Sequence, residues 1–265
     1  GNLGQVDFEN TGRLVGGTIV SSDPAKQLLV KSGGGATSPT FDGVTIGPAT
    51  EVLVTSGTLN VENGLRLDGG TVKLRTPAGS SLQFNGSGEQ SIEGSGSVLA
   101  GRFSSTIGGG TANIRTGTGA TLRIGSGVTV RTVENSLNVS GLSSNEGVIR
   151  SDAGAAITTL GGTNWVNRGL IQAGGGTLDL TGNWANTTGT LDAQAGTIAF
   201  RSAFDTADIG TTTRGATGLF EVSTGGVWNN AGLTYDLGAA GNLGQVDFEN
   251  TGRLVGGTIV SSDPA

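Results

Sequence analysis

The sequence predicts an all-β fold: a right-handed parallel β-helix, or β-solenoid, of about 12 rungs with roughly 20 residues in each. Three observations support this fold class. A sequence unit recurs about every 20 residues, short segments alternate between apolar and polar residues, and glycine and asparagine gather between those segments. Such a chain buries its apolar side chains only when successive copies of the unit stack on one another.

The repeating unit is clearest between Trp165 and Phe200. An aromatic residue is followed two positions later by asparagine and then by a glycine. A short alternating strand comes next, and a second strand opens with Gly-Thr. The unit then begins again, because Trp165-Val166-Asn167 is matched by Trp184-Ala185-Asn186. We therefore expect three short strands in each rung of the solenoid.

Strict alternation separates this chain from a disordered glycine-rich linker. Glycine makes up 51 of the 265 residues, a share that is typical of low-complexity segments. However, residues 58–61, 71–74 and 177–180 all alternate between polar and apolar side chains. This period of two predicts strands with one buried face. The five prolines lie outside the alternating runs, as the hydrogen bonding of a sheet requires.

Taken in order, residues 1–25 already contain the unit. Three strand candidates follow at residues 28–30, 44–46 and 52–54, and residues 57–141 hold short strands between glycine-rich corners. From residue 145 onward the unit is regular. The interval between Asn186 and Asn230 fits two rungs, with Phe204 at the aromatic position of the missing one. No helical period extends over a useful length.

Residues 1–25 and residues 241–265 are identical at every position. The offset between the two copies indicates that residues 1–240 form one full long repeat, a continuous β-solenoid, and that residues 241–265 begin the next identical repeat. We interpret the chain as one period of a tandem array of long repeats in a much larger protein. An engineered duplication that caps the chain is the alternative.

Stacking of like residues on like residues predicts two ladders in the solenoid. Inward aromatic rings form a column, and corner asparagines hydrogen-bond from rung to rung as stacked amides. The predicted aromatic column consists of Phe8, Trp165, Trp184, Phe204, Trp228 and Phe248. The predicted asparagine ladder consists of Asn10, Asn145, Asn167, Asn186, Asn230 and Asn250. The tryptophans could instead stack on sugars, but their fixed spacing from the asparagines favours a structural column.

The composition removes the commonest catalytic and metal-binding groups. The chain has no Cys, His or Met, so thiol nucleophiles, imidazole bases and thiolate metal sites are absent. The closest carboxylate pairs, Asp205 with Asp208 and Glu89 with Glu93, are interpreted as solvated turn residues. Three arginines at a spacing of eight, Arg115, Arg123 and Arg131, could form a small basic strip, but solvent-facing strand positions are the favoured explanation. We predict no catalytic, cofactor or metal site.

The net charge of −6 is dispersed along the chain. Nucleic acid is not expected as a partner, because lysine and arginine form no cluster. Membrane insertion is not expected either, because no apolar run approaches the length of a spanning segment.

The aromatic-x-Asn-x-Gly and Gly-Thr-Leu-x-Leu units, with runs such as residues 16–19, 65–70 and 124–130, resemble the right-handed parallel β-helix repeats of very large secreted bacterial surface proteins. Filamentous-haemagglutinin-type exoproteins and autotransporter passengers have repeats of this style. The resemblance covers nearly the whole chain and implies a secreted or cell-surface location. No secretion or anchoring module of the haemagglutinin type is visible in the chain.

From these patterns we expect a structural segment of an extracellular fibre, stalk or adhesin scaffold, built from tandem long repeats that stack end to end, and not an enzyme. Its partners would be neighbouring repeats, because an isolated piece exposes two sheet edges. A β-helix that binds or cleaves glycans is the first alternative, with surface glycans as its partners. An engineered filament building block is the second.

Overall fold

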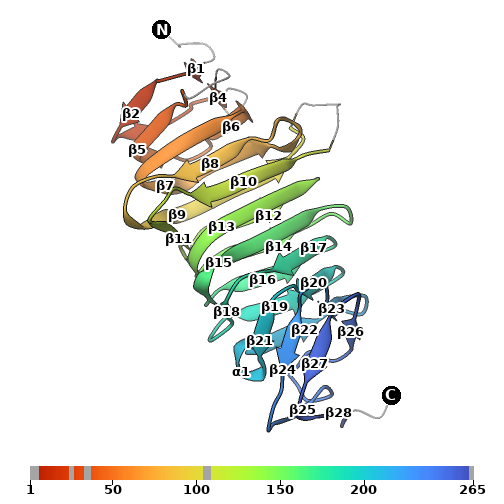
Figure 1. Ribbon diagram of the computed structural model, residues 1–265. Coiled ribbons are helices and arrows are strands. Elements are labelled where there is room, and N and C mark those ends of the chain that lie inside the picture. The colour runs from red at the N-terminus through yellow and green to blue at the C-terminus, as the bar shows by residue number, and fades with distance from the viewer. Residues whose placement is uncertain (1–5, 24–26, 33–36, 104–108, 263–265) are drawn as a thin grey trace.

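The computed structural model describes residues 6–23, 27–32, 37–103 and 109–262. In these residues short strands follow one another around a coil, and every strand pairing is parallel. Neighbouring strands come from successive rungs, as when Val148–Ser151 (β14) pairs with Leu170–Ala173 (β16). Figure 1 shows an elongated stack in which the rungs follow one another in chain order. The chain is a parallel β-solenoid, as predicted, with about 11 turns rather than about 12.

The strands form three stacks, which we call the first, second and third sides in the order in which the chain visits them. The first side contains β1 (Val6–Glu9), β4 (Gln27–Lys31), β6 (Glu51–Ser56), β12 (Val128–Thr132), β14, β16, β19 (Thr190–Ala193) and β22 (Thr211–Arg214). The second side contains β2 (Arg13–Val15), β8 (Ser81–Phe84), β10 (Thr111–Thr116), β17 (Thr177–Leu180), β20 (Thr197–Phe200), β23 (Leu219–Val222) and β26 (Val246–Phe248). The third side contains β3 (Thr18–Ile19), β11 (Ala120–Ile124), β18 (Trp184–Ala185), β21 (Ala203–Asp205), β24 (Val227–Asn229) and β27 (Arg253–Val255).

Some strands bend around a corner and contribute to more than one side. These strands are β5 (Thr40–Ile46), β7 (Thr58–Arg75), β9 (Gly88–Gly101), β13 (Ser136–Asn145) and β15 (Ile157–Asn167). Next to the C-terminal end, β25 (Thr234–Asp236) and β28 (Thr258–Val260) pair with each other where the chain returns to the first side. Two short helices interrupt the corners, the 3-10 helix η1 (Thr76–Ala78) and α1 (Thr206–Ile209).

The rungs are fewer than expected because several of them are longer than the sequence unit predicts. Asn113 in β10 lies above Ser81 in β8, a step of 32 residues. Trp165 and Trp184, by contrast, are aligned as the spacing of the unit predicts. The period read from the regular C-terminal half of the sequence therefore underestimates the rung length elsewhere.

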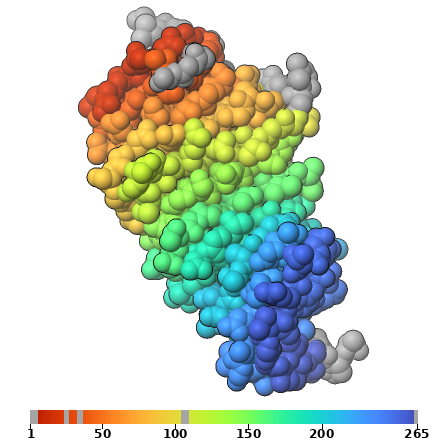
Figure 2. Space-filling model, viewed as in Figure 1, coloured from red at the N-terminus to blue at the C-terminus, as the bar shows by residue number. Residues whose placement is uncertain are grey.

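The core is an apolar column enclosed by the three sides. On the second side, the inward residues stack in register from rung to rung and are fully buried: Leu59, Leu82, Ile114, Val139, Leu160, Leu180, Phe200 and Val222. Full burial of such a side chain stabilises the fold by about 1.5–3 kcal/mol. In Figure 2 the colours follow one another in bands along the molecule, so each rung packs mainly against its neighbours in sequence. Stability thus depends on stacking, as in other solenoids.

The two copies of the duplicated segment lie at opposite ends of this stack. The first copy supplies β1, β2 and β3, and the second supplies β26, β27 and β28. Residues 1–5, 24–25 and 263–265 of the duplication lie outside the described residues. Within the described part of the chain, no helix has the length and apolar character needed to cross a membrane.

Candidate functional site

Four of the six predicted column aromatics lie inside the third side. Trp165 is aligned with Trp184, and Phe204 is aligned with Trp228. The rings of Trp184 and Phe204 stack with centroids 5.5 Å apart, and those of Phe204 and Trp228 stack at 6.1 Å. None of the four is more than 5% exposed. Because no ring face is open to solvent, these tryptophans are not platforms for sugar stacking in the folded chain.

Phe8 and Phe248 lie on other sides of the solenoid, so the prediction is wrong for Phe8 and only partly right for Phe248. Phe8 is on the first side, aligned with Val30, and its ring meets the edge of Phe41 at 5.7 Å. Phe248 is on the second side, aligned with Val222, although its ring still stacks against Trp228 at 6.5 Å. The sequence unit repeats correctly here, but the number of residues between the copies does not return the chain to the same side.

Sequence reasoning did not place three further aromatic residues that join the column from neighbouring sides. The ring of Phe200 lies 5.3 Å from Trp184 and 4.7 Å from Phe204. Phe220 stacks on Phe200 at 6.1 Å, and Tyr235 meets Trp228 edge-on at 5.0 Å. Burial raises the pKa of Tyr235, and a hydrogen bond from the Leu243 backbone partly offsets this effect. The C-terminal third of the core is therefore an aromatic cluster with residues from all three sides.

Three of the predicted asparagines form a buried chain of hydrogen bonds. Nδ2 of Asn145 donates to Oδ1 of Asn167, and Nδ2 of Asn167 donates to Oδ1 of Asn186, both at 2.8 Å. Asn167 also donates to the carbonyl of Gly169 at 3.2 Å. All three side chains are at most 1% exposed. Each amide thus links its own corner to the next rung.

The ladder changes partner in the next rung, where α1 replaces the simple corner. Nδ2 of Asn186 donates to the backbone carbonyls of Ile209 and Thr211, at 2.7 and 3.0 Å. Asn230, which is also fully buried, accepts a hydrogen bond from Oγ1 of Thr206 at 2.6 Å. Thr206 therefore stands between Asn186 and Asn230 in the position where another asparagine would have continued the ladder.

Asn10 and Asn250 do not belong to the ladder. Both side chains are exposed, and both residues have a φ of 53°, a left-handed turn conformation that asparagine tolerates better than most residues. Each follows a strand of the duplicated segment, β1 in one copy and β26 in the other. Their function at this position is to form the turn.

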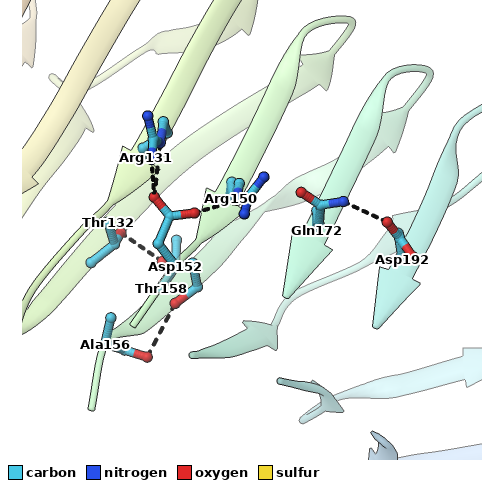
Figure 3. A network of polar contacts seen from close by, with 9 residues as sticks. Arg131, Thr132, Arg150, Asp152, Ala156, Thr158, Gln172 and Asp192 are labelled. Atoms are coloured by element: carbon cyan, nitrogen blue, oxygen red, sulfur yellow. Dashed lines mark hydrogen bonds and ion pairs between the residues drawn. The ribbon is translucent and has the colours of Figure 1, made fainter. Parts of the chain in front are cut away.

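The outer faces hold polar networks that the sequence reasoning missed. On the first side, Asp152 accepts hydrogen bonds from Arg131 at 2.6 and 2.8 Å and pairs with Arg150. Figure 3 shows Asp152 between these two arginines, and Gln172 donating to Asp192 of the next rung at 2.6 Å. The signal available in the sequence was a polar residue at the same position of four successive first-side strands: Arg131, Arg150, Gln172 and Asp192.

The carboxylates considered as catalytic candidates all have structural partners. Asp205 and Asp208 form the capping box of α1, in which Oδ2 of Asp208 accepts the backbone N–H of Asp205 at 2.8 Å. Glu89 and Glu93 both pair with Arg123, which also binds Glu146. Burial alone would lower the pKa of Arg123, but these three glutamates raise it. A guanidinium shared in this way ties three rungs together.

The spacing of eight between three arginines corresponds to one side of the solenoid, so these arginines do not form a basic strip. Arg115 lies on the second side, Arg123 on the third and Arg131 on the first. Among the described residues, no group of three or more carboxylates is arranged to hold a metal ion.

The geometry thus consists of stacked apolar, aromatic and amide ladders inside and paired charges outside. Comparisons with family models, with curated proteins and with solved structures each find no match to this chain.

Proposed function

We propose that this chain is a structural segment of an extracellular fibre, stalk or adhesin scaffold built from tandem copies of residues 1–240. One observation carries the proposal: the described strands of the two identical copies, β1 to β3 and β26 to β28, lie at opposite ends of one solenoid. A following repeat would therefore continue the stack from the last rung without a new fold or a linker.

The interior supports a mechanical role rather than a chemical one. Inward positions hold close-packed apolar side chains that are completely buried along most of the stack. The carboxylates that could have served as catalytic pairs are held by arginine or by a helix cap. Each rung covers the open edge of its neighbour, so the array is stiff and gains length by the addition of repeats.

The proposed location is the bacterial cell surface or the secreted fraction, and the proposed relatives are filamentous-haemagglutinin-type exoproteins and autotransporter passengers. This part of the proposal rests on the repeat style, the aromatic-x-Asn-x-Gly corner followed by Gly-Thr strands. The net charge of −6 favours solubility.

A longer chain, in which residues 1–240 are followed directly by residues 1–265, tests the fibre proposal. Small-angle X-ray scattering and negative-stain microscopy would compare its length with that of the single chain. We expect one straight rod that is longer by about 50 Å, because ten added rungs at roughly 4.8 Å each give this length. Two bodies joined by a flexible hinge would contradict the proposal.

A glycan array probed with the single chain separates the alternative function from the proposed one. We expect no binding and no release of oligosaccharide. Saturable binding to one glycan class, or cleavage of it, would favour a glycan-directed β-helix instead. Sizing at increasing protein concentration adds a second check, because the two uncovered end rungs should promote end-to-end association.

A further inference from the structure

The two copies of the duplicated segment occupy different sides of the solenoid. In the first copy, β1 lies on the first side, β2 on the second and β3 on the third. In the second copy, β26 lies on the second side and β27 on the third, and β28 follows where the chain returns to the first. Identical sequence is thus displaced by one side.

Both copies nevertheless turn the same residues inward. Phe8 is aligned with the buried Val30, and its counterpart Phe248 is aligned with the buried Val222. Leu14 lies opposite the buried Phe41, and its counterpart Leu254 lies opposite the buried Trp228. The segment therefore adopts one conformation at both ends, and the displacement concerns only its position around the axis.

The two copies also use opposite edges of the segment. The first copy pairs with the rung that follows it, formed by β4 and β5. The second copy pairs with the rung that precedes it, formed by β23, β24 and β25. Together the two ends display both contacts that this segment would make in the middle of a tandem array.

We propose that the open edge of β26, β27 and β28 is the docking surface for strands β4 and β5 of a second copy of the repeat. The register is that of the first copy, so Val246 meets Leu28, Leu254 meets Phe41 and Ile259 meets Ile46. This inference rests on the proposed function and adds that each repeat is rotated by one side relative to the one before it.

The exposed apolar residues of the last rung fit this occupant. Phe248 is 46% exposed and Leu254 is 37% exposed, although both lie at inward positions of the stack. We call the place where two repeats meet the joint. There, Phe248 would pack between Trp228, against which it already stacks, and Phe41 of the next copy, which the counterpart residue Phe8 already contacts. The core would then pass from one repeat to the next without a gap.

Charge complementarity points to the same occupant. Asp247 is aligned with Glu221, so two acidic residues lie side by side on the outer face of the last two rungs of the second side. At the other end, Nζ of Lys31 lies 2.6 Å from Asp7 and 3.6 Å from Glu9. Docking would bring Lys31 of the next copy to Asp247 and Glu249, and would bring its Asp42 and Glu62 to Arg253, as they now hold Arg13.

The rotation has a geometric consequence for the array. After β1 the chain returns to the first side ten times, the last time in β25, before β26 begins the next copy on the second side. One period is therefore ten rungs plus one side, and only three periods restore the starting orientation. A feature on one side of the repeat, such as the polar network of Figure 3, is presented in three directions in turn along the fibre.

Cysteine cross-linking tests the joint, because the native chain contains no cysteine. It uses the longer chain described above, residues 1–240 followed by residues 1–265, which we call the two-period chain. The test variant combines Glu221→Cys in the first copy with Asp7→Cys in the second. Neighbouring parallel strands are about 4.8 Å apart, which lies within the Cα range of disulfides. The control variant combines Thr234→Cys in the first copy with Asp7→Cys in the second, the pairing expected if the period were a whole number of rungs.

We expect the Glu221 pair to oxidise on the order of tenfold faster than the Thr234 pair, because only the former falls within disulfide distance. A Glu9→Cys, Lys31→Cys pair within the second copy should oxidise as fast and reports the other edge of the joint. The single chain with Glu221→Cys and Asp247→Cys gives the same readout without requiring the longer chain to fold.

The outcomes distinguish the joint from the fibre proposal. Faster oxidation of the Thr234 pair, or slow oxidation of both pairs in a chain that still forms one straight rod, would overturn the rotated joint and leave the fibre proposal standing. Slow oxidation in a chain that forms two hinged bodies would overturn both.

Discussion

At the scale of single residues, Asn167 shows why a polar side chain can lie inside this core. Its amide donates to Asn186 at 2.8 Å and accepts from Asn145 at 2.8 Å, and it is 1% exposed. A buried amide without partners would destabilise the fold, whereas one that continues a ladder satisfies its neighbours as well as itself. Each buried asparagine therefore stabilises the fold only if its neighbours in the ladder are also asparagines or other hydrogen-bonding partners.

The first prediction is that Asn167→Ala lowers the free energy of unfolding by about 2–4 kcal/mol, because it deprives Asn145 and Asn186 of a buried partner at once. Urea unfolding followed by circular dichroism measures the change. Asn183→Ala is the matched control: this asparagine donates to Asn164 at 3.0 Å, but on the exposed surface. Its effect should stay within about 0.5 kcal/mol. If both variants lost the same free energy of unfolding, the buried ladder would stabilise the fold no more than an exposed hydrogen bond does.

The second prediction concerns the stability of the fold at acidic pH. Hydrogen bonds from Asn63 and then Arg13 lower the pKa of Asp42 below its usual 3.8. Partial burial raises the pKa of Glu51, but Lys73 and Gln27 outweigh burial and lower it below its usual 4.5. A carboxylate with a lowered pKa stabilises the folded state above its unfolded pKa, and this contribution is lost as the pH falls through the folded value.

Stability should therefore fall as the pH drops below about 4. Urea midpoints measured from pH 7 to pH 2 report this dependence. Glu51→Gln should make the acid-side decline shallower, because it removes one of the carboxylates whose protonation weakens the folded state. A stability that rises between pH 5 and pH 3 would refute the assignment.

At the scale of elements, the corners decide how closely rungs can approach. Strands on all three sides tolerate many alternating sequences, but the backbone of a corner lies directly on the backbone of the corner below. A Cβ built on Gly218, which precedes β23, would lie 1.6 Å from the carbonyl oxygen of Ala193. Glycine at this corner is thus required by close approach between rungs.

The third prediction follows from that approach. Gly218→Ala must push two rungs apart and should destabilise the fold by about 3 kcal/mol or more. Gly154→Ala is the control, since its Cβ would meet nothing closer than the Gly175 oxygen at 3.7 Å. That change should be neutral or stabilise the protein by up to about 1 kcal/mol, by restricting the unfolded chain. Thermal unfolding of both variants compares them, and a neutral Gly218→Ala would contradict the stacked corner.

At the scale of the whole molecule, stability is distributed along the axis. Middle rungs are covered on both edges, whereas the terminal rungs are covered on one. Exposure reflects this difference: Phe248 and Leu254, at inward positions of the last rung, are 46% and 37% exposed, while the inward residues of β8 to β23 are buried. A linear stack of this kind opens from its ends.

The fourth prediction is a gradient in amide hydrogen exchange. Exchange measured by mass spectrometry should be slowest between residues 58 and 222 and faster in residues 6–19 and 246–260, because end rungs open at lower free energy. In the two-period chain, the inner copy of the duplicated segment should become as slow as the middle rungs. Uniform exchange along the single chain would show that the solenoid unfolds as one unit.

The sequence by itself determined the fold class and the inside or outside position of most strand residues. Alternation with a period of two predicts strands with one buried face, and the recurrence of a short unit predicts that these strands stack as rungs, because each unit buries its apolar face against its neighbours. It also placed Trp165 over Trp184, since the segment between them forms one regular rung without an insertion. These are local properties of the chain and can be read in any one rung.

Only the tertiary structure decided the phase of each copy around the axis. Rungs vary in length, as the step of 32 residues from Ser81 to Asn113 shows, but such a rung still returns the chain to the same side. The side changes only with the number of strands that separate two copies of the unit. For this reason Phe8 lies outside the predicted column, and Phe248 reaches Trp228 from the second side. The side on which a residue lies depends on how many strands and corners the chain has formed before it, which no single repeat contains.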